Sequence, residues 1–189
     1  AITPLGEKMA AFPVHPRYAR LFIEASGSRC VRPAALAAAL GHERALLLPL
    51  KDKRAAGERE SLLVDSSAED SDVLVELKAL ETARARRFDP GFCKNMGIHG
   101  ATARRCWQAA GQFLTIAGAQ SLRIEDESES DWHALRKCLL ATFPDFLARR
   151  LDRGTLRCAM VHGRRATRRR ESIVESEYLI STEIEERNA

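Results

Sequence analysis

The sequence has no long apolar run and lacks a secretory leader pattern. Its apolar stretches are short, and the one at residues 45–50 contains Pro49 and ends at Lys51, whereas a transmembrane helix needs about 18 or more consecutive apolar residues. No basic segment followed by an apolar core occurs at the N-terminus, which argues against secretion. We therefore expect a cytoplasmic protein without membrane contact.

Cysteines are few, and their spacing indicates no disulfide framework or zinc site. The five are odd in number, widely separated and form no Cys-x-x-Cys pair: Cys30, Cys93, Cys106, Cys138 and Cys158. His42-Glu43 begins like a zinc-peptidase motif, but Leu46 stands where the second histidine is needed. We expect most of the cysteines to be small core residues and no metal to be bound.

The chain also lacks the short motifs of nucleotide and acyl chemistry. No Gly-x-x-x-x-Gly-Lys-Ser/Thr phosphate loop and no Gly-x-Ser-x-Gly elbow is present. The chain alone is therefore not expected to hydrolyse ATP, and we predict no catalytic residue and no cofactor in it.

Helical periodicity dominates the first three quarters of the sequence. Apolar residues recur at helical intervals in six segments, separated by proline bends, glycines or capping residues: 5–9, 17–25, 34–40 between Pro33 and Gly41, 73–84 capped by Ser71 or Asp72, 101–117, and 132–146 with a bend after Thr142 at Pro144. Residues 51–72 are charged and small and are predicted to be an exposed connection, with Leu62 to Val64 as a packed turn.

After Arg150 the pattern changes to that of strands. Residues 156–161, 166–168 and 178–184 are predicted strands, and His162-Gly163 is a plausible hairpin turn between the first two. The acidic stretch 119–131 before the last helix is the best candidate for a domain linker. The predicted fold class is mainly α with a C-terminal β part.

One segment has an unusual charge distribution. Residues 149–170 hold nine arginines and one aspartate, while residues 171–189 hold six glutamates and one arginine. The arginines around the hairpin could contact nucleic-acid phosphates: Arg164, Arg165, Arg168, Arg169 and Arg170. They could equally form a solvated face paired with Glu171, Glu175 and Glu177.

A second basic group lies at predicted helix ends. Its members are Arg84, Arg86, Arg87, Lys94, Arg104 and Arg105. They could line a groove, but the helix dipole already stabilises cations near a helix C-terminus. Trp107, Phe113 and Trp132 fall on apolar stripes, so we interpret them as core residues rather than base-stacking platforms.

Several short sequence motifs, in order, resemble the C-terminal region of DEAH-box RNA helicases. Residues 2–25 resemble the end of the winged-helix domain, through Thr3, Gly6, Pro13, His15, Pro16, Arg17 and Ala19. The helical ratchet region is matched by Ser71, Asp72, Phe92, Cys93 and Gln112. Residues 138–164 are similar to the start of the OB-like domain, especially in the bacterial HrpB-like branch, through Phe143, Pro144, Asp145, Ala148, Arg149, Arg150, Gly163 and Arg164.

This resemblance implies a division of the chain and a function. Residues 1–25 would end a winged helix, 26–118 would form a ratchet-like helical bundle, 119–131 a linker, and 132–189 a partial OB-like barrel. The chain would be a fragment whose RecA-like motor domains, with their ATP and Mg²⁺, lie N-terminal of Ala1. Its partners would be those domains and single-stranded RNA, with DNA as an open alternative. Both basic groups become candidate nucleic-acid contacts, namely Arg164, Arg165, Arg168, Arg169 and Arg170, and Arg84, Arg86, Arg87, Arg104 and Arg105.

Two other functions stay open at this point. The basic hairpin and acidic tail could bind a protein partner such as an assembly factor, or the chain could turn over nucleotide without a motor. RNA affinity that falls with salt at a log–log slope near −3, for about four neutralised phosphates, would favour nucleic-acid binding. An ATPase assay of the purified chain tests the third possibility.

Overall fold

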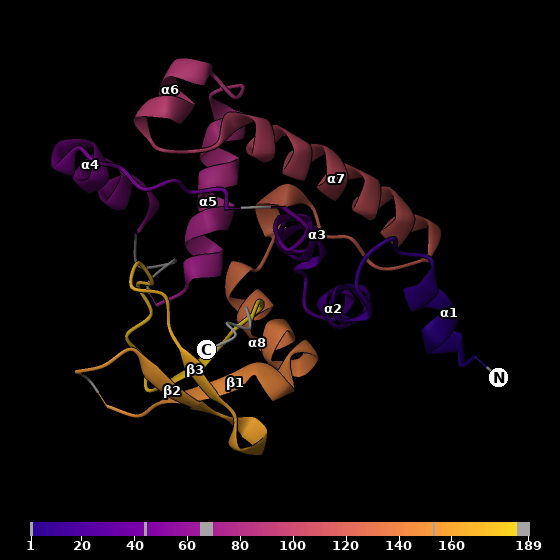
Figure 1. The fold of residues 1–189 in the computed structure, drawn as a ribbon. Helices are drawn as coiled ribbons and strands as arrows, with labels where there is room; N and C mark the ends of the chain where they lie inside the picture. Colours follow the sequence, from indigo (N-terminus) through magenta and orange to yellow (C-terminus); the bar gives the residue numbers. More distant parts are fainter. Residues whose placement is uncertain (1, 44, 65–69, 153, 185–189) are drawn as a thin grey trace.

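The computed structural model describes residues 2–43, 45–64, 70–152 and 154–184. Eight α-helices lie in this described part: α1 (Pro4–Ala10), α2 (Pro16–Ser26), α3 (Val31–Leu40), α4 (Lys53–Leu63), α5 (Asp72–Ala85), α6 (Pro90–Asn95), α7 (Gly100–Ala119) and α8 (Trp132–Thr142). They are followed by four short strands: β1 (Leu147–Arg150), β2 (Arg157–Met160), β3 (Arg165–Thr167) and β4 (Tyr178–Ile180). The helices and the sheet occupy different ends of the molecule (Figure 1).

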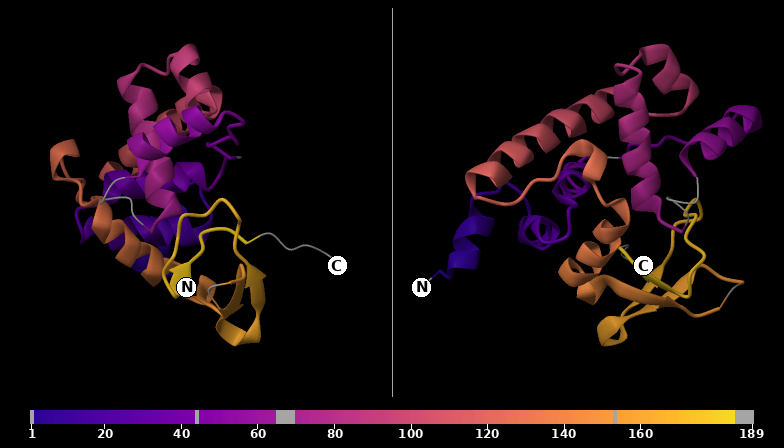
Figure 2. Two further views of the ribbon diagram at one scale, coloured as in Figure 1. Left: turned by 90° about the vertical axis from the view of Figure 1, so that its left-hand side faces the viewer. Right: turned by 180° about the vertical axis from the view of Figure 1, so that it is seen from behind.

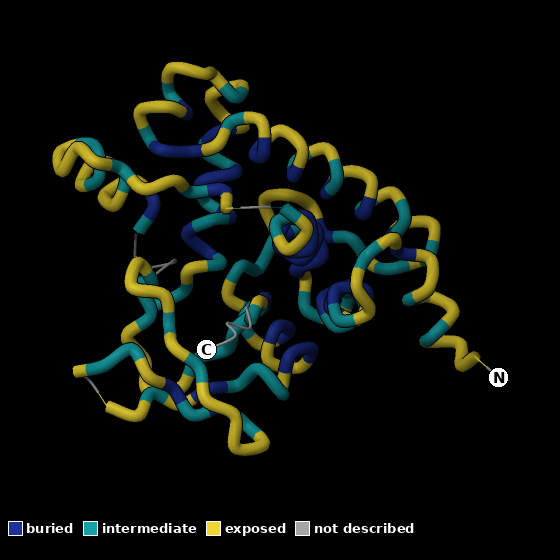
Figure 3. The backbone as a smooth tube through the Cα atoms, viewed as in Figure 1, coloured by how far each residue is buried: buried dark blue, intermediate teal, exposed yellow. Residues whose placement is uncertain are grey.

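The alanine-rich helix α3 is the centre of the hydrophobic core. Ala34, Ala35 and Ala38 are fully buried, and the small side chains let α3 pack closely on α7 and α2. The buried backbone is concentrated where these three helices meet (Figure 3). Phe22 of α2 joins them by stacking on Phe12 at 4.4 Å and meeting the edge of Phe113 at 5.9 Å between ring centroids.

Three predicted helices occur with the predicted caps and faces. The Ser71 hydroxyl accepts a hydrogen bond from the Leu74 N–H at 3.3 Å, so Ser71 rather than Asp72 caps α5. Helix α7 buries the predicted stripe, including Cys106 and Phe113. Helix α8 ends at Thr142 instead of bending there and continuing to Phe146, because Pro144 cannot extend the α-helix and starts a 3-10 turn.

The prediction of a connection over residues 51–72 was wrong at residues 53–63, which form a helix, although that helix is largely exposed as expected; residues 65–69 of the predicted span lie outside the described residues. Helix α4 occupies eleven of those residues and is capped by Asp52, whose carboxylate accepts from the Arg54 N–H at 3.0 Å. Its residues are good helix formers, and an i,i+4 ion pair joins Arg54 to Glu58 at 3.0 Å, but only Leu63 is buried. A helix without an apolar stripe gives no periodic signal in the sequence.

Helix α3 begins two residues earlier than Pro33, where the sequence placed its start. Its N-cap residue, Cys30, makes no side-chain capping bond; instead Glu125 accepts from the N–H groups of Val31 at 3.0 Å and Arg32 at 2.8 Å. Glu125 lies in the acidic stretch 119–131 and is only 5% exposed. That stretch therefore contributes a buried charge to the helical core.

The four strands form one open antiparallel sheet in the order β3-β2-β1-β4. The three predicted strands are present, with Val161–Gly163 as the turn between the first two. β1 was missed, because its four residues directly follow a helix and allow only one cycle of alternation. The fold class, mainly α with a C-terminal β part, is confirmed; the sheet is not closed into a barrel.

Arg17 ties the helical part to the start of the sheet. Its guanidinium donates two hydrogen bonds to the Asp145 carboxylate, at 2.5 and 2.6 Å, and lies 4.7 Å from the centroid of the Phe146 ring. Helix α8 also packs on α2. The helices from α2 to α8 thus share one core, while the four-part division of the chain stays a prediction.

Candidate nucleic-acid interface

Strand alternation separates the arginines of the basic segment onto two faces of the sheet. Ladder pairs place Arg165, Ala159, Arg149 and Tyr178 in one row across β3, β2, β1 and β4. Arg157, two residues before Ala159 on β2, lies on the same face. The three arginines are exposed, and Tyr178 is 58% exposed. We call Arg149, Arg157, Arg165 and Tyr178 the outer sheet face.

The outer sheet face concentrates positive charge around a small residue. Arg149 and Arg165 flank Ala159, and Arg157 is a diagonal neighbour of both, at about 7–8 Å by standard sheet geometry. Among the described residues, no carboxylate lies within ion-pair distance of these three arginines. Their mutual repulsion therefore favours an external anion on this face.

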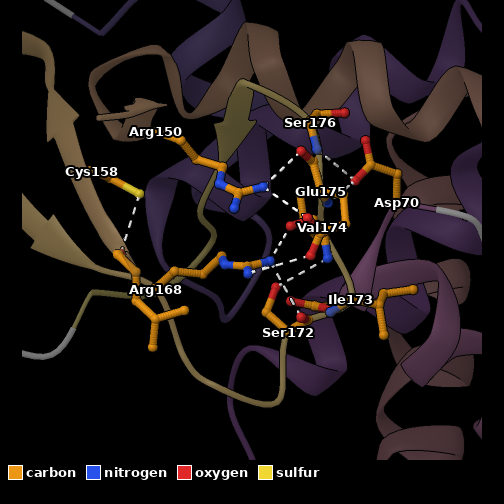
Figure 4. A network of polar contacts seen from close by, with 11 residues as sticks. Asp70, Arg150, Cys158, Arg168, Ser172, Ile173, Val174, Glu175 and Ser176 are labelled. Atoms are coloured by element: carbon orange, nitrogen blue, oxygen red, sulfur yellow. Dashed lines mark hydrogen bonds and ion pairs between the residues drawn. The ribbon is translucent and has the colours of Figure 1, made fainter. Parts of the chain in front are cut away.

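The opposite face of the sheet is buried, and two arginines of the segment, Arg150 and Arg168, lie on it. Ala148, Cys158 and Met160 form a small apolar cluster there. Arg150 and Arg168, with side chains only 9% and 10% exposed, reach the loop before β4 (Figure 4). Both bind Glu175: Arg150 donates to its carboxylate at 3.0 Å and to its carbonyl at 2.8 Å, and Arg168 lies 3.6 Å from the other carboxylate oxygen.

Further contacts show that this network is part of the fold. Arg168 donates to the carbonyl oxygens of Ser172, at 3.3 Å, and Val174. The hydrogen bond and charge of Arg150 lower the pKa of Glu175 below its ordinary value. Asp70, just before α5, accepts from the N–H groups of Glu175 and Ser176, as Figure 4 shows. The pairing alternative from the sequence thus holds for Arg168 and Glu175.

The remaining hairpin arginines are exposed at the edge of the sheet. Arg164 ends the turn after His162, whose φ of 59° is left-handed, and Arg170 lies in the loop after β3. Arg169 is exposed but pairs with Glu183 at 3.2 Å. Arg164, Arg165 and Arg170 are therefore the members of the predicted cluster that leave their charges toward solvent.

The second predicted basic group lies at the other end of the molecule, around the end of α5, α6 and the start of α7. Most of its members contact their own surroundings. Arg105 binds Glu43 through two hydrogen bonds of 2.8 and 2.6 Å, and Arg84 binds Glu127 at 2.6 Å. Arg86 and Arg104 lie over the rings of Phe92 and Phe88, at 5.4 and 5.6 Å.

Arg87, with a left-handed φ of 53°, follows α5 and is exposed. In all views the C-terminal end of α5, helix α6 and the N-terminal end of α7 lie far from the sheet (Figures 1 and 2). The ten predicted site residues thus form two separate groups, and a common role for them stays a prediction.

Sequence reasoning missed Arg149, Arg157 and Tyr178 as members of one surface. Exposed and buried residues alternate along Arg149-Arg150 and along residues 156–161. This pattern predicts which side chains share a face of the sheet only once β1 and the strand register are known. Within the described part of the chain, no group of three or more metal-ligating side chains occurs, and every helix is too short or too polar to cross a membrane.

Comparison with known proteins relates the chain to ATP-dependent helicases. It is 28% identical over 137 residues to the ATP-dependent DNA/RNA helicase DHX36 of Bos taurus and, over the same length, of Homo sapiens. It is 32% identical over 119 residues to the DExH-box ATP-dependent RNA helicase DExH1 of Arabidopsis thaliana. The matches cover 69% and 61% of this chain but only 14% and 12% of the relatives. No family model matches the chain.

These matches make the chain a distant homologue of DEAH/DExH-box RNA helicases over the matched residues. The resemblance seen in the sequence is confirmed at that level. The HrpB-like branch and the subdomain assignment stay predictions.

Proposed function

We propose that this chain is a noncatalytic accessory region of an ATP-dependent DEAH-box RNA helicase and binds single-stranded nucleic acid. The outer sheet face is the surface that supports this proposal. Three exposed arginines without a close ion pair among the described residues suit phosphates, the Asp152 carboxylate lying within electrostatic range of Arg157 alone. Tyr178 beside Arg149 offers a ring on which a base can stack. Contacts of these two kinds are independent of base sequence, as a translocating enzyme requires.

The finer assignment follows from the residues that carry the resemblance. Residues 26–118 act as the ratchet-like bundle and residues 132–189 as the OB-like part of a bacterial HrpB-like enzyme. RecA-like motor domains in the same polypeptide bind ATP and Mg²⁺, and their motion moves the strand across the walls that this region supplies. RNA is the expected strand, although one relative is named a DNA/RNA helicase.

The buried arginines have a different role in this proposal. Arg150 and Arg168 hold the loop before β4 in place through Glu175. In the alternative hypothesis the acidic tail binds a protein partner. Glu175 belongs to that tail, but its carboxylate is already paired with Arg150 and Arg168. We therefore assign the nucleic-acid contact to the outer sheet face and a positioning role to the inner face.

The test compares two triple variants with equal change in net charge. In the first, Arg149, Arg157 and Arg165 are each replaced by Gln; in the control, the exposed helix and loop residues Arg20, Arg54 and Arg123 are replaced by Gln. At about 0.1 M salt, we expect the sheet variant to lose about 10- to 100-fold in affinity for a labelled oligouridylate of about 20 nucleotides, measured by fluorescence anisotropy.

The control variant should lose less than about threefold, because only the general attraction of the strand to positive charge is reduced. Circular dichroism of both variants checks that they fold. Equal losses in the two variants, or no binding by the unmodified chain even at low salt, would contradict the proposal and favour a protein partner.

A further inference from the structure

A cavity of about 250 Å³ lies between α3, α5, α7 and the segment that leads into α8. In Figure 1 the chain after α7 runs back beside α3 to reach α8, which closes this side of the helical part. Of the ten predicted site residues, Arg84 lines it.

Two indole rings and small residues form the apolar walls. Trp107, Gly111 and Leu114 share one face of α7 at i, i+4 and i+7, and Trp132 is the first residue of α8. Both tryptophans are only partly buried, so the core does not cover their rings completely. A Cβ placed on Gly111 would meet no atom within 4 Å, which shows that the space in front of this face is open.

The polar lining shows that a flat charged group already lies on one ring. The guanidinium carbon of Arg84 is 4.3 Å from the centroid of the Trp107 ring, and the same guanidinium donates to Glu127 at 2.6 Å. Arg32 also lines the cavity and donates through Nε to the carbonyl oxygen of Glu125 at 2.7 Å. The arginines are thus held by their own partners and form a fixed rim.

Glu81, three residues before Arg84 on α5, is the lining residue with unused hydrogen-bonding capacity. Among the described residues, none donates a hydrogen bond to its carboxylate. Partial burial, and secondarily the charge of Glu127, raise the pKa of Glu81 above its ordinary value. The carboxylate oxygens of Glu81 are accessible rather than sealed in the core, so they can accept a hydrogen bond from a ligand that enters the cavity.

Size, charge and shape together select the chemical class of the ligand. Two arginines and two glutamates in the lining cancel, so the site suits a neutral group rather than a phosphate. The volume is below the roughly 300–1,000 Å³ of sites for drug-sized ligands. Flat aromatic walls and one free acceptor fit a small planar ring that carries an amino group.

We propose that this cavity binds a single unstacked nucleobase, lying against the ring of Trp132 with its exocyclic amino group donating to Glu81. Adenine, cytosine and guanine each carry an exocyclic amino group and uracil does not, so the site prefers these three bases to uracil. The proposal extends the proposed function, on which it rests, because it supplies a second contact on the strand that the outer sheet face holds by its phosphates.

Trp107 and Trp132 are the only tryptophans in the chain, so intrinsic fluorescence reports on this cavity alone. The full chain is titrated with adenosine and with uridine, which carry no phosphate. We expect adenosine to quench the emission and uridine to bind at least about fivefold more weakly, a factor typical of one hydrogen bond. The Glu81→Leu variant, which has no acceptor, should lose most of that preference, while Glu129→Leu, the matched change outside the cavity, should keep it.

Two variants test the aromatic wall itself. Trp132→Ala should weaken adenosine binding by about tenfold, since stacking of a base on an aromatic ring contributes on the order of 1–3 kcal/mol. Gly111→Leu fills the open space while favouring the helix, and it should abolish the quenching without loss of folding. The second variant keeps the test decisive if the first does not fold.

The outcomes separate this inference from the proposed function. If oligonucleotides bind with the expected salt dependence but neither adenosine nor an oligoadenylate changes the emission, the base site is overturned and the proposed function stands. If adenosine quenches but no oligonucleotide binds, the base site stands as a nucleoside site and the proposed function fails. Quenching that is unchanged in Gly111→Leu also overturns the base site.

Discussion

Replacing Glu125 by alanine is expected to lower the free energy of unfolding by about 3 kcal/mol. The substitution removes two charge-assisted hydrogen bonds to the first N–H groups of α3, each typically worth about 1.5–3 kcal/mol, and an anion at the positive end of that helix. Part of this loss in stability is offset, because the alanine variant no longer has the free-energy cost of burying a carboxylate. Because Cys30 makes no side-chain capping bond, no side chain at the N-cap replaces Glu125.

Urea denaturation at neutral pH measures the effect, with Glu129→Ala as the control. Glu129 lies in the same acidic stretch but is exposed, so its replacement should change the free energy of unfolding by less than about 0.5 kcal/mol. Glu125→Gln should fall between the two, since an amide oxygen can accept only one of the two bonds well. A loss no larger for Glu125→Ala than for the control would show that α3 does not depend on this cap.

The Glu76→Gln variant is expected to be more stable than the unmodified chain at about pH 8, by up to about 3 kcal/mol. Burial raises the pKa of Glu76 from 4.5 to about 7, and the charges of Asp72 and Glu183 add to this, while Arg169 opposes it. Tyr18 and Cys106 also lie within electrostatic range of Glu76. The deprotonated form therefore costs free energy in the folded state that glutamine does not.

The pH window follows from the direction of the shift. Since the folded state holds the proton more tightly, the stabilisation by protonated Glu76 is full below about pH 4.5, falls between about pH 4.5 and 7, and is lost above. Between about pH 5 and pH 8, the free energy of unfolding should thus fall less for Glu76→Gln than for the unmodified chain, as measured by unfolding curves at the two pH values. Glu60→Gln, an exposed change on α4, serves as control; equal pH dependence in all three would contradict the shift.

Local signals made the helical part of the fold predictable from sequence. The stripe of α7, the serine cap of α5 and the proline after Thr142 each act within a few residues, so the sequence alone predicts them. Helix α4 was missed because it lacks an apolar stripe: a helix that buries only Leu63 has no apolar face to detect. Its local signals were the Asp52 cap and the helix propensity of most of its residues.

The site required information that no local pattern carries. Glu125 caps α3 from more than ninety residues away, and Glu175 binds Arg150 across twenty-five. The sequence predicted a basic cluster, but not that Arg165 would join Arg149 and Arg157 on the outside while Arg168 turned inward. That division depends on the register of β1, β2 and β3, and one residue of slip would reverse it.

The salt dependence of single-strand binding tests most directly whether the outer sheet face holds phosphates. Each phosphate neutralised on a single strand contributes about 0.7 to the log–log slope, so replacing Arg149, Arg157 and Arg165 by Gln should make the slope shallower by about 2. The slope for the control variant should change by less than about 0.7. Identical slopes for the unmodified chain and the sheet variant would show that nucleic acid, if bound, is held elsewhere.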